Sequence, residues 1–385
     1  MPKYFKYFFV FYTFLPLLIL NFMMFDQQQF VYLAKAFLEG STSLTTLPPT
    51  NHDLSFFEGK YFWPLGPFPA IILVPFVSIF KLNFTQGFIQ LPLTIFNFWL
   101  IIKIAKTQNL ESKKALFLAI FFIFGSIYTP LAALALSWNF AQVVATTCLL
   151  FALFEFFTNR RWFLIGLAIA FATLTRAHLI VASVFFITYL LQKPTNTKRI
   201  ITFIIPILLS LVILAIYNYT RFGSIFESGY KYQLVPEESA KRRGLGIISP
   251  AHIPANLYYM LIKTPDPVFE NSSHVLKPPY IRFDPYGMSI FLMSPILFLI
   301  FLTNFKDKYV KTSLFTITVL LIPITTYYGI GYIQVGYRYA LDFFPFLLVP
   351  LISVFKKTSI NLIKILVILG IFISWFFTIE KIVGY

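Results

Sequence analysis

Acidic and basic side chains are scarce in this chain of 385 residues, so the few that stand beside apolar segments are the candidates for chemistry. Asp26 directly follows the apolar run 7–25. A carboxylate at the mouth of a helix is suited to act as a general base or to hold a metal ion. The alternative is a solvated helix end, and position alone does not separate the two interpretations.

A second carboxylate, Asp53, belongs to an irregular segment that also contains His52 and Lys60. Prolines and glycines follow between positions 59 and 67. Near a membrane, such backbone is tolerated only where protein or a wet cavity covers it. We therefore expect Asp53 and Lys60 to face a cavity; the alternative is a polar loop with interfacial aromatic residues. A single His-Asp pair is too little to indicate a metal site.

Arg176 has a specific reason to need an anionic partner. The apolar segment before it, 162–175, would form a helix about 21 Å long, and the returning segment 177–191 is equally short. Both fall short of the roughly 30 Å of a bilayer core, so Arg176 and the neighbouring His178 should lie below the outer membrane surface. A buried arginine there costs about 2.5–3.5 kcal/mol, which favours a wet cavity with an anion. The alternative is a side chain that snorkels to the interface.

Further candidates lie later in the chain. Arg221 opens a long polar stretch together with several aromatic residues, a combination that suits sugar stacking and phosphate contact. The same rings could anchor the segment at a membrane interface. Arg338 and Asp342 are four residues apart and would share one helix face. Either they pair with each other, or Arg338 meets an anion while Asp342 orients it.

The elements that must position these residues are apolar helices. Hydrophobic residues make up 58% of the chain and charged residues 12%, about half the usual charged share of a soluble domain. The apolar residues form long blocks, and about 20 such residues are needed for a helix to cross a bilayer. Outer-membrane barrels are excluded because their strands alternate apolar and polar residues. The composition predicts an all-α, polytopic transmembrane protein of the cell membrane.

Basic residues in short loops mark the cytoplasmic side of a membrane protein. If every Lys and Arg cluster between apolar blocks is cytoplasmic, the chain crosses about eleven times, with a cytoplasmic N-terminus formed by a retained first helix. The predicted helices are 5–25, 88–106, 114–136, 138–157, 161–175, 178–191, 200–217, 287–304, 312–330, 339–354 and 360–379.

Most acidic residues then fall on the outer side, in two long loops, 26–66 and 218–286. Long ordered loops commonly carry function, so we expect the active site on the extracytoplasmic side. Two short helices should lie at that surface: an amphipathic helix over 30–39 and an interfacial or re-entrant helix over 68–80. Residues 1–385 form a single domain in this interpretation, without a separate soluble domain.

Composition also excludes several functions. The net charge of +16 is explained by the cytoplasmic clusters, so we expect membrane lipids and no nucleic acid as partners. The sequence contains no P-loop, no dinucleotide-binding glycine motif, no HExxH and no CxxC pair. Nucleotide sugars and ATP are therefore not expected as direct substrates. The single Cys148 indicates nothing about redox compartment.

Several short motifs, in their order along the chain, resemble the GT-C glycosyltransferases, and within them the bacterial protein-mannosyltransferase and aminoarabinose-transferase group. Each motif alone is weak, and the ordered set covers nearly the whole chain. The chain departs from the group in lacking a C-terminal soluble domain and an adjacent Asp-Glu pair in the first outer loop. The motifs are Asp26 after the first helix, Asp53-x-Ser55 with Gly59-Lys60-Tyr61 and Pro64-x-Gly66, Thr173-Leu174-Thr175-Arg176, Tyr217-Asn218-Tyr219 with Arg221-Phe222-Gly223, and Gly336-Tyr337-Arg338-Tyr339 with Asp342.

The resemblance implies transfer of a hexose or pentose from a polyprenyl-phosphate donor to a hydroxyl of a lipid, glycan or protein at the outer face. It implies Asp26 as the catalytic carboxylate, with Asp53 as second choice. Substrate contacts would come from Lys60, Arg176, His178, Arg221, Arg338 and Asp342. No metal ligands are assigned, and a divalent cation is left open. The alternatives are a transporter or flippase of lipid-linked glycans, which would show broken helices near the midplane, and a scaffold without catalysis.

Overall fold

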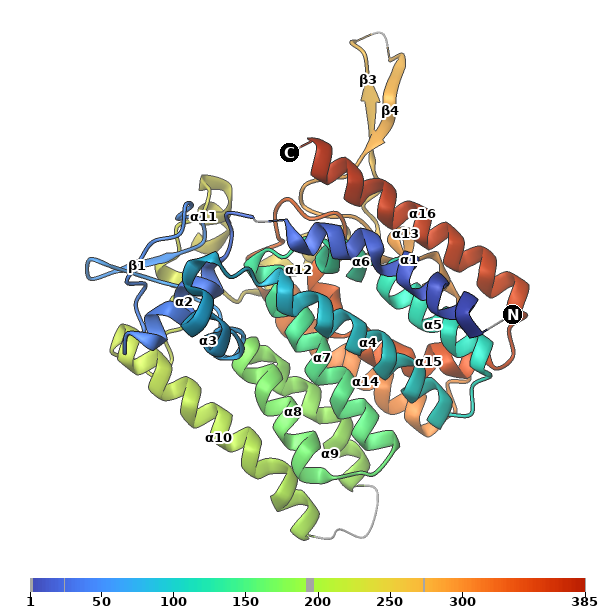
Figure 1. Ribbon diagram of the computed structural model, residues 1–385, viewed down its shortest axis with the longest axis horizontal. Helices are drawn as coiled ribbons and strands as arrows, with labels where there is room; N and C mark the ends of the chain where they lie inside the picture. Colours follow the sequence, from blue (N-terminus) through green and yellow to red (C-terminus); the bar gives the residue numbers. More distant parts are fainter. Residues whose placement is uncertain (1–2, 24, 192–196, 273, 385) are drawn as a thin grey trace.

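Helices make up most of the chain in the computed structural model, which describes residues 3–23, 25–191, 197–272 and 274–384, with side chains from residue 13 onward (Figure 1). Among the described residues, five helices are long and apolar enough to cross a membrane. They are α4 (Gly87–Thr107), α7 (Ser137–Phe157), α10 (Thr197–Phe222), α14 (Lys308–Thr326) and α16 (Ile360–Gly384). The predicted helical class is thus confirmed.

Shorter helices fill the space around these five. Several of them are apolar and too short to span a bilayer alone. The shorter helices are α2 (Gln29–Leu38), α3 (Phe68–Phe80), α5 (Ser112–Phe124), α6 (Tyr128–Ala133), α8 (Trp162–Thr175), α9 (Ser183–Leu191), α11 (Glu237–Gly244), α12 (Ile253–Leu261), α13 (Ile290–Met293) and α15 (Phe344–Phe355). The first helix, α1 (Lys3–Phe22), has 20 residues.

The strands in the described part of the chain form two small antiparallel hairpins. β1 (Ser55–Phe57) pairs with β2 (Lys60–Phe62), with Phe56 opposite Tyr61. β3 (Asp266–Phe269) pairs with β4 (Leu276–Arg282), and this hairpin projects away from the helices beside the end of α16 (Figure 1).

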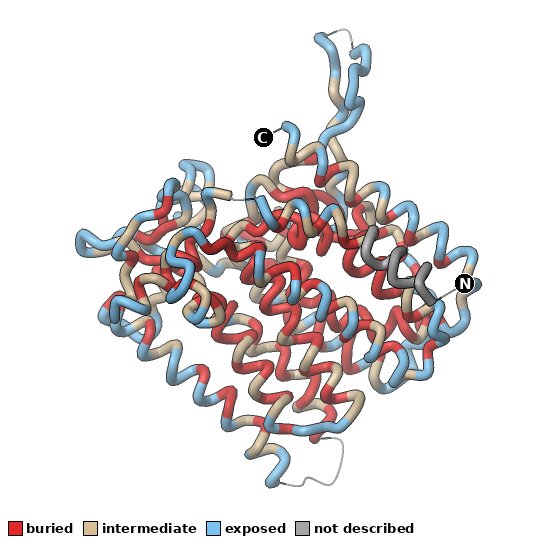
Figure 2. The backbone as a smooth tube through the Cα atoms, in the orientation of Figure 1, coloured by how far each residue is buried: buried red, intermediate tan, exposed pale blue. Residues whose placement is uncertain are grey.

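Helix α7 lies at the centre of the bundle, between α4 and α8, and almost its whole surface is buried (Figure 2). Helix α8 packs in turn against α10. Their backbones come unusually close at Gly166, where an added Cβ would lie 2.1 Å from the Phe203 carbonyl oxygen. In contrast, α10 exposes a row of apolar side chains that includes Leu208, Leu209 and Val212. A helix with such an outward face is suited to contact with lipid.

Two predicted helices at the loop surface are confirmed. The amphipathic segment 30–39 corresponds to α2, whose buried face includes Phe30, Leu33 and Ala34. The segment 68–80 forms α3 with the predicted bounds. The two helices pack against each other, and α3 also contacts α7 and α8.

Several predicted helices are not continuous. The segment 114–136 breaks at Gly125, where an added Cβ would approach the Ile371 backbone of α16 to 3.1 Å. Ser126 stabilises the break, because its Oγ accepts from the Tyr128 amide at 3.0 Å. The segments 178–191, 287–304 and 339–354 each contain a tighter 3₁₀ turn: Ala177–Ala182, Pro295–Leu302 and Arg338–Asp342.

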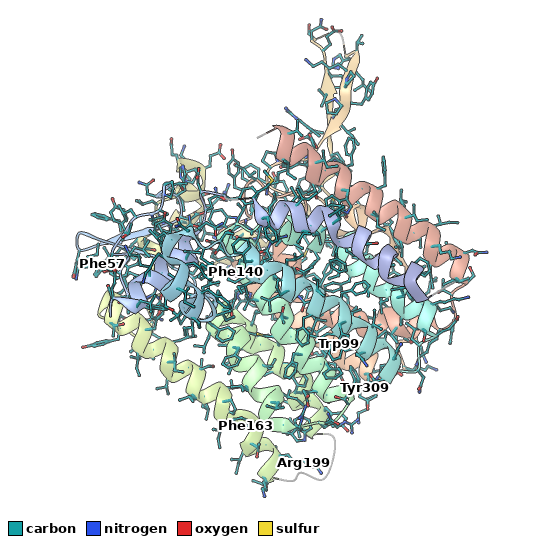
Figure 3. The ribbon with its side chains drawn as sticks, viewed as in Figure 1. Phe57, Trp99, Phe140, Phe163, Arg199 and Tyr309 are labelled. Carbon is teal, nitrogen blue, oxygen red and sulfur yellow. The ribbon has the colours of Figure 1, made fainter. Side chains whose placement is uncertain are left out.

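The bundle has two chemically distinct ends. At one end, basic residues at the short turns donate hydrogen bonds to neighbouring helices. Lys114 Nζ donates to the Phe355 carbonyl of α15 at 2.8 Å, and Arg160 Nη1 donates to Tyr189 Oη of α9 at 2.7 Å. At the other end the long segments 26–66 and 218–286 pair, and the Asp53 amide donates to the Leu234 carbonyl at 3.0 Å. Figure 3 shows Phe57 at this loop end, far from Arg199 and Tyr309.

Candidate functional site

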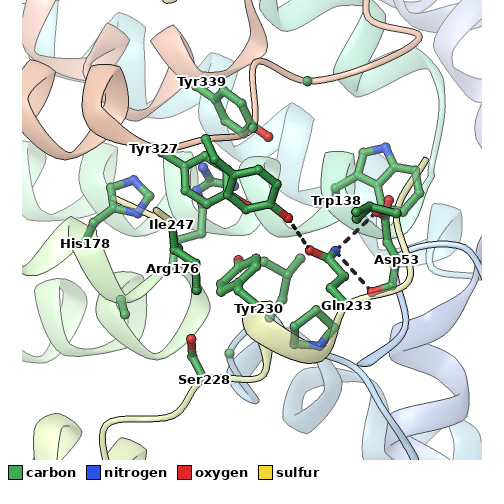
Figure 4. Close-up of a pocket in the computed structure, with 18 of the residues that line it drawn as sticks. Asp53, Trp138, Arg176, His178, Ser228, Tyr230, Gln233, Ile247, Tyr327 and Tyr339 are labelled. Carbon is green, nitrogen blue, oxygen red and sulfur yellow. Dashed lines mark hydrogen bonds between the residues drawn. The ribbon is translucent and has the colours of Figure 1, made fainter. Parts of the chain in front are cut away.

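A cavity of about 660 Å³ lies where the two long loops meet the ends of the helices (Figure 4). Its walls come from residues 52–66 of the first loop and 228–248 of the second. The ends of α7, α8, α10 and α14 and residues 329–339 complete it. A concave site of this size, mostly apolar with a few polar groups, is typical of a small-molecule or lipid-headgroup site.

Asp53 is held in the cavity wall by the pairing of the two loops. Its backbone is in the left-handed region (φ 63°), which Asp tolerates better than most residues. The Leu234 amide donates back to the Leu54 carbonyl at 2.8 Å, and Ser55 Oγ donates to the Gly229 carbonyl at 2.7 Å. Burial raises the pKa of the Asp53 carboxyl, partly offset by the nearby positive charge of Arg338. A carboxylate with a raised pKa is a stronger base.

Arg176 and His178 both contact one oxygen of Asp342. Arg176 Nη2 donates to Asp342 Oδ2 at 2.9 Å, and His178 Nε2 lies 2.8 Å from the same oxygen. The Asp342 side chain is 1% exposed. The expected anionic partner of Arg176 is therefore a residue of the chain itself. Arg176 and His178 line the cavity, whereas Asp342 stands behind them.

Arg338 differs from Arg176 in having no carboxylate within ion-pair distance among the described residues. Its guanidinium lies over the rings of Trp138 and Tyr339, 5.7 Å and 5.3 Å from their centroids. Gln142 Nε2 donates to the Arg338 carbonyl at 2.8 Å and so fixes its backbone. Of the two interpretations, the one in which Arg338 pairs with Asp342 is wrong, because Asp342 in the 3₁₀ turn contacts Arg176 instead.

Arg221 lines the cavity but its guanidinium is already engaged. Nη1 donates to the Trp63 carbonyl at 2.9 Å, and Nη2 donates to Asn218 Oδ1 at 2.8 Å. Its charge also lies 3.8 Å from the centroid of the Tyr217 ring. Arg221 therefore joins the end of α10 to the first loop and has fewer free donors than Arg338.

Two predicted site residues do not reach the cavity. Asp26 is exposed in the turn between α1 and α2, although its neighbour Gln27 lines the cavity. Lys60 is exposed at the start of β2. The structure thus brings together Asp53, Arg176, His178, Arg221 and Arg338, with Asp342 behind them.

The segment Pro64-Leu65-Gly66 closes the cavity over the end of α8. Gly66 approaches that helix so closely that an added Cβ would lie 2.0 Å from the Leu174 carbonyl oxygen. Only glycine permits this approach. The contact places the first loop directly beside Arg176.

Sequence reasoning missed most of the aromatic and amide groups of the site. Trp138, Tyr230, Tyr327 and Gln233 line the cavity (Figure 4). Burial raises the pKa of Tyr230, so its hydroxyl stays protonated and can donate a hydrogen bond. Because tyrosines are spread along the whole chain, they gave no local signal in the sequence.

The charge of the cavity favours an anionic ligand. Among its described lining residues, Asp53 is the one carboxylate, while Arg176, Arg221, Arg242 and Arg338 supply positive charge. No group of three His, Cys, Asp or Glu side chains in the described part of the chain is placed to hold a metal ion. Comparison with known proteins found no matching family model, no matching curated protein and no matching solved structure.

Proposed function

We propose that this protein is a membrane glycosyltransferase that moves a sugar from a polyprenyl-phosphate donor to a hydroxyl acceptor. The observation that carries the proposal is the cavity that holds one carboxylate of raised pKa, Asp53, near Arg338, whose guanidinium has no carboxylate partner among the described residues. A base and a cation in one aromatic-lined site are the groups that transfer from a sugar phosphate requires.

In this proposal the chain is a GT-C-like protein that crosses the membrane about eleven times and has a cytoplasmic N-terminus. The basic turns around Lys114 and Arg160 gather at one end, and the paired long loops gather at the other. Because positively charged turns favour the cytoplasm, the cavity opens on the extracytoplasmic side. Helices too short to span alone, such as α8, place their ends at the depth of the cavity.

The reaction needs one proton transfer and one bond exchange. The acceptor oxygen attacks the anomeric carbon, a new glycosidic bond forms, and the bond from that carbon to the phosphate oxygen breaks. The Asp53 carboxylate takes the acceptor proton. The electron pair of the broken bond remains on the polyprenyl phosphate, whose negative charge Arg338 stabilises. The phosphate is already a good leaving group and needs no proton.

Arg338 is assigned to the phosphate ahead of Arg176 because their surroundings differ. The charge of Arg176 is balanced by Asp342 at 2.9 Å. Arg338 lies over aromatic rings, with Asp53 nearby. A phosphodiester would give its guanidinium strong, charge-assisted hydrogen bonds.

The walls of the cavity also suit a lipid-linked substrate. Leu214 of α10 and Pro323 and Ile324 of α14 supply an apolar side to the cavity. A polyprenyl chain could leave the site along these residues into hydrocarbon, while the sugar and phosphate remain among the polar groups.

Release of polyprenyl phosphate from a lipid-linked sugar tests the proposal without knowledge of the acceptor, because water can replace the acceptor slowly. Purified protein in nanodiscs would be given polyprenyl phosphates that carry a hexose or a pentose. Asp53→Asn should reduce release by about 10²–10⁴-fold, whereas Asp26→Asn, at an exposed carboxylate outside the cavity, is the matched control and should stay near wild type.

Unchanged release in Asp53→Asn would exclude this carboxylate as the base. Loss of release in Asp26→Asn alone would assign the role of base to Asp26. Movement of intact lipid-linked sugar between leaflets, without release of polyprenyl phosphate from any donor, would identify a transporter instead.

A further inference from the structure

The side chain of Gln233 lies between the two loops and contacts Asp53 twice. Its Nε2 donates to the backbone carbonyl of Asp53 and to Asp53 Oδ1, each at 3.2 Å (Figure 4). Gln233 is 9% exposed, so these bonds are largely shielded from water. Within the described part of the chain, no hydrogen bond reaches the other carboxylate oxygen, Oδ2.

The orientation of this amide follows from its partners. A backbone carbonyl can only accept, so the group facing the Asp53 carbonyl must be the NH₂ of Gln233. The amide oxygen then faces Tyr328, whose hydroxyl donates to Gln233 Oε1 at 2.8 Å. Tyr328 is buried. A flipped amide would turn its oxygen toward the carbonyl and Oδ1 of Asp53, which only accept, and would lose both bonds to Asp53.

The backbone of Gln233 is fixed as well. Arg243 Nη1 donates to the Gln233 carbonyl at 2.7 Å. The neighbouring Leu234 exchanges backbone hydrogen bonds with Asp53 and Leu54. The amide is thus held on both sides, by the second loop and by Tyr328 after α14.

We infer that Gln233 is a positioning residue for Asp53: it holds Oδ1, leaves Oδ2 for the acceptor proton, and favours the ionised carboxylate. The catalytic meaning of this inference rests on the proposed function, while the effect of the amide on Asp53 does not. A hydrogen bond donated to a carboxylate stabilises the charged form. Gln233 therefore opposes part of the effect of burial on the pKa of Asp53.

Other charged or titratable groups also influence the titration of Asp53, so their effects must stay constant when Gln233 is changed. His52 and Arg338 favour the ionised carboxylate. Tyr230 and Tyr328 are its titratable neighbours from the second loop and from the segment after α14. None of these residues is changed in the Gln233 variants, so a shift of the Asp53 titration would report the amide.

The test measures the protonation of Asp53 directly. A carbodiimide adds to protonated carboxyl groups, and mass spectrometry of the Asp53 peptide gives the labelled fraction at each pH. In Gln233→Leu, loss of the donor should move the labelling midpoint up by roughly one pH unit. Gln233→Glu should move it further, because a second carboxylate disfavours ionisation. Gln108→Leu, at the far end of α4, is the control and should leave the midpoint unchanged.

Tyr328→Phe supplies a second variant that removes one oxygen and keeps the ring. It frees the amide to turn, so the midpoint should rise by less than in Gln233→Leu. An unchanged midpoint in both variants, with folding intact, would overturn the inference.

Release of polyprenyl phosphate is measured on the same preparations. In Gln233→Leu, the pH below which release falls should move up together with the labelling midpoint. A shifted midpoint in a protein that releases no polyprenyl phosphate from any donor would refute the proposed function and retain the effect of the amide. Normal release with an unshifted midpoint would refute the inference alone.

Discussion

Arg176 donates to Asp342 at 2.9 Å, although 166 residues separate them along the chain. The pair is almost fully buried, and it joins the end of α8 to the 3₁₀ turn before α15. Removing one partner of a buried pair leaves an uncompensated charge. The pair therefore explains how an arginine can stand at the tip of a hairpin too short to span a bilayer.

The first prediction concerns the stability of this pair. Asp342→Leu should lower the free energy of unfolding by about 3 kcal/mol, measured by thermal or denaturant unfolding in detergent. Arg176→Met combined with Asp342→Leu should recover part of the loss, because no charge is then left unpaired. A thermodynamic cycle in which Asp342→Leu couples to Arg338→Met, and not to Arg176→Met, would contradict the assigned partner.

The general architecture could be predicted from sequence because it depends on local composition. Apolar blocks of bilayer length predict helices wherever they occur, and α2 and α3 followed from short apolar stretches bounded by glycine or proline. The need of Arg176 for an anionic partner was also predictable, since it follows from the lengths of two neighbouring segments. These inferences needed no knowledge of which helices meet.

The remaining features depend on contacts between distant parts of the chain. Asp342 was expected near Arg338 because helical spacing is local, whereas its actual partner, Arg176, directly follows α8. Gln233 lies 180 residues from Asp53 and belongs to no motif. The break at Gly125 reflects a close approach to α16. No local pattern encodes such contacts, so only the fold could show that Asp53 lines the cavity and Asp26 does not.

The second prediction concerns the pH dependence of release. The base must be ionised, and burial raises the pKa of Asp53 above its ordinary value of 3.8. Activity should therefore fall on acidification at a pH above that value. The free energy of unfolding should change in the opposite direction. The folded state favours the protonated carboxyl, so the protein loses stability as the pH rises from 3.8 through the raised pKa of Asp53. Asp53→Asn should release polyprenyl phosphate about 10²–10⁴-fold more slowly but be no less stable at neutral pH, and marked destabilisation would indicate a structural role.

The third prediction concerns Gly66. Gly66→Ala should displace the first loop from the end of α8, since the Leu174 carbonyl leaves no space for a Cβ. Overpacking typically costs about 1–3 kcal/mol, and release should fall because the loop carries Asp53. Gly244→Ala, at a glycine with nothing near its added Cβ, is the control. Equal behaviour of the two variants in unfolding and release would contradict the close approach.

The fourth prediction concerns topology. Both long loops should be extracytoplasmic, and their direct pairing at Asp53 and Leu234 requires that they share one side. In a Cys148→Ala background, cysteines at Ser43 and Ser272 should react with an impermeant thiol reagent in intact cells. A cysteine at Lys357 should react only after lysis. Labelling of the Lys357 position in intact cells, or protection of either loop, would contradict the proposed orientation.

The last prediction concerns the lipid phosphate. Arg338→Gln should weaken binding of polyprenyl phosphate by about 10–100-fold, because a hydrogen bond to a charged group contributes roughly 1.5–3 kcal/mol. Arg338→Lys should retain part of the affinity, since it keeps the charge and loses the fork geometry. Arg176→Gln should weaken binding less, because Asp342 already balances its charge. Binding in nanodiscs, with folding checked separately, gives the ranking. A larger loss in Arg176→Gln than in Arg338→Gln would place the phosphate at the end of α8, with Asp342 orienting the arginine toward it.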